Sequence, residues 1–69
     1  MKISARNQLQ GKVTNIQEGA VNGIVTLDIG GGKTITATIS MSAIKDLGLK
    51  VGQDACAIIK ATSVMIAVD

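Results

Sequence analysis

Apolar and polar residues alternate through two neighbouring segments in the middle of the chain, and this pattern constrains the fold more than any other feature. Val25, Leu27 and Ile29 fall on one face of the first segment. Residues 34–40 alternate strictly and are rich in β-branched side chains. A period of two residues is typical of a half-buried strand. Because Gly30-Gly31-Gly32-Lys33 separates the two segments, we expect a β-hairpin.

Three further segments are predicted to be strands, and one is predicted to be a short helix. The strands are residues 9–17, 54–60 and 63–68, with a break at Ala61-Thr62 between the last two. Ser40 or Ser42 can cap a helix over residues 43–47, which Gly48 would end. The order of elements predicts an all-β fold, a five-stranded OB-like barrel with one short helix between strands 3 and 4. An SH3-like barrel is the main alternative.

The chain, 69 residues long, is expected to form one domain over residues 1–69, and such a small domain is marginally stable on its own. Cys56 is the only cysteine, so no disulfide can close within the chain. Apolar residues make up 46% of the sequence and its mean hydropathy is +0.40, more than a barrel of this length can bury. We therefore expect the surplus apolar surface to contact other subunits of a homo-oligomer.

Composition also excludes several classes of function. The chain has no Phe, Tyr or Trp and a formal net charge of only +2, which disfavours a nucleic-acid partner. Histidine is absent and the acidic residues are scattered, so we expect no bare metal cation, no cofactor and no enzymatic activity. No apolar run or leader-like segment indicates a membrane, and the unpaired Cys56, interpreted as a buried small side chain, agrees with a cytoplasmic location.

The glycine run could also be interpreted as a phosphate-binding loop. A Walker loop ends in Gly-Lys-Ser/Thr before a helix, whereas Gly32-Lys33-Thr34 leads into an alternating strand. A hairpin turn is therefore the favoured interpretation.

Two short segments are rich in hydrogen-bond donors and contain no carboxylate: Ser4-Ala5-Arg6-Asn7 and Lys60-Ala61-Thr62-Ser63. A deprotonated tetrahedral oxyanion can only accept hydrogen bonds, so hydroxyls, backbone N–H groups and cations suit it. The same residue types are also ordinary in solvated turns, and their spacing alone does not separate the two interpretations.

Four motifs in order resemble the molbindins and related molybdate-binding domains: residues 4–11 (SARNQLQG), Ile39-Ser40, residues 47–52 (LGLKVG) and residues 59–65 (IKATSVM). The resemblance implies an OB-like barrel, called a TOBE or Mop domain, that assembles as a hexamer of three dimers with oxyanions bound between subunits. It implies that Arg6 and Lys60 supply charge and that Ser4 and Ser40 donate hydroxyls. Backbone N–H groups of Ala5 and Ala61 would contribute, with further candidates nearby: Asn7, Thr62 and Ser63.

The resemblance also implies a second kind of oxyanion pocket near the symmetry axis. The candidate segment for it is Gly19-Ala20-Val21-Asn22, followed by Gly23, and a plain hairpin turn is the alternative. The implied function is binding of molybdate or tungstate for intracellular molybdenum storage and homeostasis. The alternative is a molybdate-sensing module that regulates or interacts with a partner.

Overall fold

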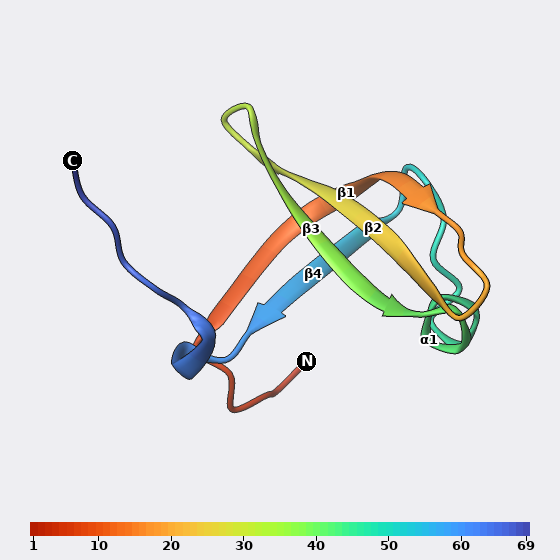
Figure 1. Cartoon of the computed structure of the whole chain (residues 1–69), viewed down its shortest axis with the longest axis horizontal. Helices are drawn as coiled ribbons and strands as arrows, with labels where there is room; N and C mark the ends of the chain where they lie inside the picture. The colour runs from red at the N-terminus through yellow and green to blue at the C-terminus, as the bar shows by residue number, and fades with distance from the viewer.

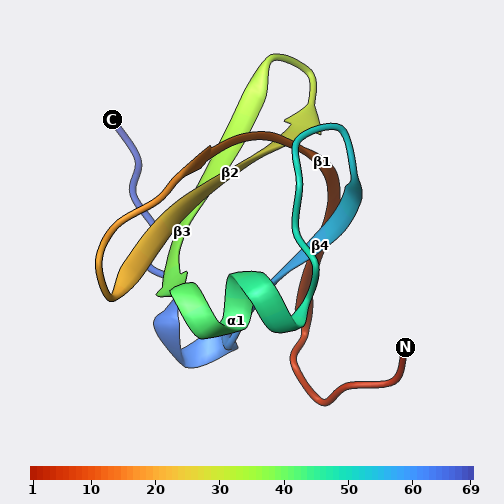
Figure 2. The ribbon, with the colours of Figure 1, turned by 90° about the vertical axis from the view of Figure 1, so that its right-hand side faces the viewer.

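The computed structural model describes all 69 residues, and its main feature is one curled antiparallel sheet (Figures 1 and 2). The sheet has four strands in the order β3-β2-β1-β4. The strands are β1 (Asn7–Gln17), β2 (Asn22–Gly30), β3 (Lys33–Ser40) and β4 (Asp54–Ile59). Helix α1 (Met41–Asp46) lies across one opening of the curled sheet, and a 3-10 turn, η1 (Ala61–Ser63), follows β4.

The β2–β3 connection is the predicted hairpin and not a phosphate-binding loop. Gly30, Gly31 and Gly32 all have positive φ, at 96°, 62° and 75°. This conformation is readily available only to glycine, which explains the run of three. Asp28 stabilises the turn by accepting a hydrogen bond on Oδ1 from the Gly30 N–H at 2.8 Å.

A serine cap and a glycine with positive φ define the two ends of helix α1. Of the two candidate caps, Ser40 is the one used, because its Oγ accepts the Ala43 N–H at 3.0 Å. Gly48, with φ 62°, follows the helix in the left-handed conformation. Ile44 is buried against Gly23, where an added Cβ would lie only 2.5 Å from Ile44 Cδ1. The absence of a side chain at Gly23 therefore lets the helix pack on the sheet.

The curl of the sheet depends on a close approach between β1 and β2. A Cβ on Gly11 would lie 2.6 Å from the carbonyl oxygen of Asp28. Farther along β1, the pairing register shifts between Val13 and Asn15. Irregularities of this kind bend a strand and increase its twist. Together they give the sheet the shape of a half-barrel.

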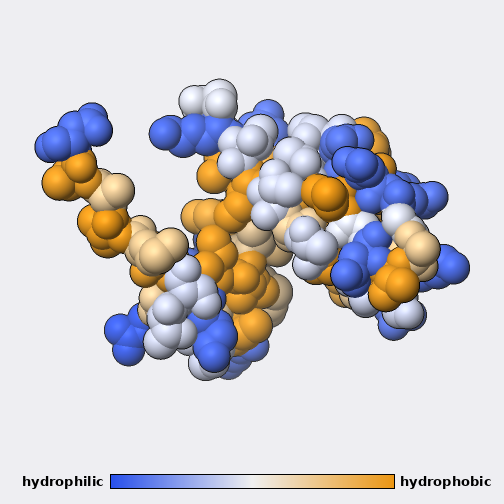
Figure 3. Space-filling model, in the orientation of Figure 1, coloured by the Kyte–Doolittle hydropathy of each residue, from blue (hydrophilic) through white to orange (hydrophobic).

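The interior of this half-barrel is incompletely covered. Only four apolar residues are buried: Val13, Val25, Leu27 and Ile44. Apolar side chains of β2, β3 and β4 line an open groove of about 590 Å³ on the concave face. We call it the apolar groove, and Figure 3 shows hydrophobic surface continuing across this region.

The all-β class is confirmed by this structure, but the prediction of five strands was wrong. Residues 63–68 do not pair with any strand of the chain. Residues 64–69, which we call the C-terminal arm, leave the body of the molecule after η1 (Figure 1). The Ile66 and Val68 side chains are 88% and 91% exposed. A strand is defined by its pairing, and this segment is an extended, mainly apolar run without a neighbouring strand.

Candidate oxyanion-binding site

The pairing of β1 with β4 brings the two donor-rich segments of the sequence together. Asn7, the first residue of β1, is paired with Ile59, the last residue of β4. Arg6 immediately precedes the first of these residues and Lys60 immediately follows the second, so both cations lie at the same corner of the sheet. Residues 4–6 and 60–63 therefore flank one corner, although more than fifty positions separate them in the sequence.

The charged and hydroxyl groups at this corner are available to a ligand. The one salt bridge of the chain joins Lys12 and Asp54, so no carboxylate neutralises Arg6 or Lys60. Both cations are exposed, as is Ser4. The corner thus combines two free positive charges with a hydroxyl, and residues 4–6 and 60–63 include no acidic side chain.

The η1 turn adds backbone donors to the same corner. Within the turn, the Ser63 N–H donates to the Lys60 carbonyl at 2.9 Å and the Val64 N–H donates to the Ala61 carbonyl at 3.3 Å. The N–H groups of Ala61 and Thr62 have no acceptor within the chain. Since backbone N–H groups normally find a partner, these two can serve a bound anion or water.

Two amide side chains hold the backbone on either side of this corner. The Asn7 Nδ2 donates to the Ile59 carbonyl at 3.3 Å, and the Gln8 Nε2 donates to the Ala5 carbonyl at 2.9 Å. Asn7 was predicted as a site residue, whereas Gln8 was not. The only signal for Gln8 in the sequence was its position inside the SARNQLQG motif.

Ser40 does not join the other predicted site residues within a single chain. It pairs with Asn22 at the end of β3 and caps α1, far along the sheet from η1 in Figure 1. Its Oγ accepts the Ala43 N–H, but a hydroxyl keeps one proton to donate. Ser40 can therefore contribute to the corner formed by Arg6 and Lys60 only if it comes from another copy of the chain.

The second predicted segment forms the exposed turn between β1 and β2. A Cβ on Gly19 would overlap the Asn22 carbonyl oxygen, so the tightness of the turn accounts for this glycine. The Val21 carbonyl accepts the Met41 N–H at 2.8 Å, which ties the turn to the start of α1. An oxyanion role for residues 19–22 stays a prediction.

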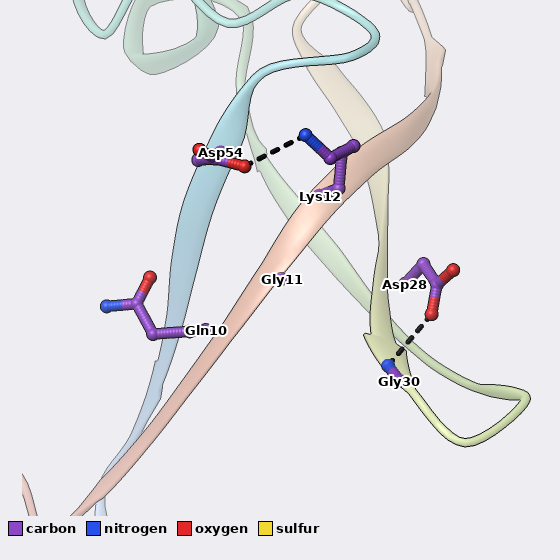
Figure 4. A pocket seen from close by; sticks show the side chains of 6 residues that line it. All are labelled: Gln10, Gly11, Lys12, Asp28, Gly30 and Asp54. Atoms are coloured by element: carbon purple, nitrogen blue, oxygen red, sulfur yellow. Dashed lines mark hydrogen bonds and ion pairs between the residues drawn. The ribbon is translucent and has the colours of Figure 1, made fainter.

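A separate polar hollow lies between β1, β2 and β4 and is unsuited to an anion (Figure 4). It contains two carboxylates, those of Asp28 and Asp54. Its one cation, Lys12, is already paired with Asp54 at 3.0 Å. An oxyanion here would meet like charge, so this hollow is not a second candidate for the site.

The Cys, Asp and Glu side chains of the chain form no metal site, and Cys56 lies apart from the candidate oxyanion site. No cluster of three or more His, Cys, Asp or Glu side chains could hold a metal ion. Cys56 is half-buried on β4 and lines the apolar groove. Neither helical segment has the length and hydropathy of a membrane-spanning helix.

Comparison with known proteins identifies the fold. The model of the TOBE domain matches residues 3–66. The chain belongs to the TOBE-domain family. This TOBE domain is 61% identical over 69 residues to a probable molybdenum-pterin-binding protein of Haemophilus influenzae, with all of both chains covered.

Two solved structures are also similar to this TOBE domain. MopII from Clostridium pasteurianum has a TM-score of 0.92 and 46% identity, with 97% of this chain and 100% of that chain covered. A molybdate-binding protein from Sporomusa ovata has a TM-score of 0.92 and 34% identity, with 99% and 100% covered. These matches confirm the resemblance to the molbindins.

Proposed function

We propose that this TOBE domain binds molybdate, or the similar tungstate, as an intact oxyanion and holds it in the cytoplasm without chemical conversion. The observation that carries the proposal is the corner at which Arg6 and Lys60 meet, both free of carboxylates. The backbone N–H groups of Ala61 and Thr62, which have no acceptor within the chain, lie at the same corner. The names of its relatives, which concern molybdenum and molybdate, agree with this chemistry.

The donor set matches the electronic character of a deprotonated tetrahedral oxyanion. Such an anion offers only acceptor oxygens, so it is stabilised by N–H and O–H donors and by positive charge. Hydrogen bonds to charged groups contribute about 1.5–3 kcal/mol each, twice the value for neutral pairs. Arg6 and Lys60 are therefore expected to dominate the affinity, with Ser4, the hydroxyls of Thr62 and Ser63, and the N–H groups of Ala5 and Ala61 adding directional contacts.

The free oxyanion is favoured over a molybdenum-pterin, although the Haemophilus influenzae relative and others are named for the latter. A pterin is a flat, conjugated ring, and proteins commonly hold such rings between aromatic side chains. This chain contains no aromatic residue with which to stack a ring. The candidate site instead offers small hydroxyls, backbone N–H groups and cations.

A homo-oligomer is the second part of the proposal. The single chain leaves two complementary apolar surfaces uncovered, the apolar groove and the C-terminal arm. Strands β3 and β4, at the two edges of the sheet, each have one unpaired side. An arm supplied by a second copy would fill the groove and pair with an edge, replacing the missing fifth strand. The resemblance to molbindins favours three such dimers in a hexamer.

Assembly also accounts for Ser40. Because the strand register puts Ser40 near one end of β1 and the corner of Arg6 and Lys60 at the other, we propose that Ser40 of one subunit completes the site formed by another. Sites shared between subunits bind the anion only in the assembled state, so ligand would stabilise the oligomer by mass action.

The proposal is tested by calorimetric titration of the purified protein with sodium molybdate, alongside light scattering to obtain the mass of the assembly. We expect saturable binding to an oligomer. The variants Arg6→Gln and Lys60→Met should each lower the affinity about ten- to a hundredfold, the factor that one charge-assisted hydrogen bond supplies. Lys12→Met is the matched control, because it removes the same charge from a lysine outside the site.

Sulfate provides a test of selectivity in the same titration. A rigid cavity formed for a larger tetrahedron leaves donors unpaired around a smaller one, so sulfate should compete poorly. Molybdate affinity that is equal in wild type, Arg6→Gln and Lys60→Met would remove the assigned site. Absence of binding by the wild type would refute the function itself.

A further inference from the structure

Adjacent side chains at the start of β1 hold two peptide groups that lead into the candidate site. Gln8 donates to the carbonyl of Ala5, and Asn7 donates to the carbonyl of Ile59. Each of these carbonyls belongs to the residue immediately before one of the two cations, Arg6 and Lys60. The two contacts therefore act on equivalent positions in the two halves of the site.

Holding a carbonyl fixes the N–H group on the other side of the same peptide bond. All peptide bonds of the chain are trans, so the C=O and N–H of one peptide group point in opposite directions. With the Ala5 carbonyl held by Gln8, the Arg6 N–H must point away from the Gln8 amide. The same holds for the Lys60 N–H when Asn7 holds the Ile59 carbonyl.

We propose that Gln8 and Asn7 are positioning residues for the oxyanion site: they keep the carbonyl oxygens of Ala5 and Ile59 engaged and turned away from the anion. This inference rests on the proposed function. A carbonyl oxygen facing an oxyanion would place two acceptors against each other without a proton between them. By occupying both carbonyls, the amides exclude that arrangement and orient the backbone that carries Arg6 and Lys60.

The Gln8 contact is poorly explained as a contribution to stability. Gln8 is exposed, and its hydrogen bond spans only three residues at the end of the sheet. Gln10 lies two residues farther along β1, on the same face, and is also exposed, but its side chain makes no hydrogen bond within the chain, including to the residues around it in Figure 4. The difference between these two glutamines is the contact with the segment that carries Ser4 and Arg6.

The pair of glutamines provides a matched test. In Gln8→Met the side chain keeps nearly the same length and loses its donor, and Gln10→Met makes the identical change where no contact exists. We expect Gln8→Met to bind sodium molybdate about three- to tenfold more weakly, the factor for one neutral hydrogen bond, while Gln10→Met binds as wild type does. The melting temperature of the ligand-free protein should be the same in both variants.

A spectroscopic readout separates positioning from a general loss of structure. In the ligand-free protein, the carbonyl carbon shift of Ala5 and the amide shifts of Arg6 should change in Gln8→Met and stay unchanged in Gln10→Met. Asn7→Leu should produce the same pattern at Ile59 and Lys60. Because Asn7 is half-buried, Gln8→Met decides the question if Asn7→Leu does not fold.

The outcomes distinguish this inference from the function on which it rests. Wild-type protein that shows no molybdate binding overturns the proposed function and the inference with it. Wild-type protein that binds, with Gln8→Met binding equally well or Gln10→Met weakened equally, overturns the positioning role alone. Weaker binding confined to Gln8→Met, accompanied by the shift changes at Ala5 and Arg6, supports it.

Discussion

The substitution Ile66→Asp tests directly whether the C-terminal arm holds subunits together. Ile66 is 88% exposed in the single chain, so a charge at this position leaves the fold of one chain intact. If the arm of each subunit lies in the apolar groove of a second copy, the same substitution places a carboxylate among apolar side chains. We therefore expect Ile66→Asp to dissociate the oligomer while preserving the half-barrel.

The magnitude follows from the burial of one large aliphatic side chain in each arm. Full burial of an isoleucine contributes about 2 kcal/mol, so a dimer that exchanges two arms loses about 4 kcal/mol, which raises its dissociation constant about a thousandfold. This is a lower bound, because a buried and unpaired carboxylate carries a desolvation cost of its own.

Sedimentation velocity over a range of protein concentrations measures this change. Met65→Asp is the control, because Met65 is 92% exposed and an arm docked as a strand would point the Met65 and Ile66 side chains to opposite faces. We expect Ile66→Asp to sediment as a smaller species at concentrations where wild type and Met65→Asp remain assembled. An unchanged mass for Ile66→Asp, or equal dissociation of both variants, would refute the placement of the arm in the groove.

Four further results are expected from variants within the body of the protein. Gly23→Ala should destabilise the fold by about 1–3 kcal/mol in thermal unfolding, because its methyl group would overlap the Ile44 side chain. Ser40→Ala should lower the stability of the ligand-free protein by about 1 kcal/mol through loss of the helix cap. Ser40→Asp should keep the cap but weaken molybdate binding in calorimetry, since it replaces a donor with a negative charge. Lys12→Met should change stability by less than about 1 kcal/mol in thermal unfolding, because its salt bridge with Asp54 is exposed.

The hairpin and the helix were correctly predicted because local chemistry determines both. Alternation identified the hairpin, and the three glycines with positive φ explain why the turn lies between Gly30 and Lys33. Ser40 and Gly48 bounded the helix because capping and left-handed termination depend on a few adjacent residues. In each of these cases the partner of every hydrogen bond lies close in the sequence or directly across a hairpin.

The predicted fifth strand, residues 63–68, depends on a partner strand that local sequence does not specify. Residues 64–68 form a short apolar run, which is typical of a buried strand, but such a run does not indicate which chain supplies the neighbouring strand. Within one chain the arm has no partner, and the expected strand is absent. The prediction was wrong about pairing, although the apolar character on which it was based is present in the exposed side chains of Ile66 and Val68.

For the candidate site, the sequence predicted the two cations that the fold brings together, whereas it did not predict the contacts around them. Resemblance to molbindins named Arg6 and Lys60, and the β1–β4 register places both at one corner. Gln8 was missed because an exposed glutamine on a strand has no distinguishing pattern. Its proposed role depends on the direction of one carbonyl, which follows from the bend of residues 4–6 and is not encoded in any spacing.

The position of η1 explains why anion binding and assembly should depend on each other. This turn carries part of the candidate site, and it is also the only covalent link between β4 and the C-terminal arm. An anion that engages the N–H groups of Ala61 and Thr62 would restrict the turn, and a restricted turn would fix the direction in which the arm leaves. Restricting the arm beforehand reduces the conformational entropy lost when it docks on a second copy. The same contacts that neutralise the anion would thus favour the interface, and Ser40 of another subunit would close the site only once that interface had formed.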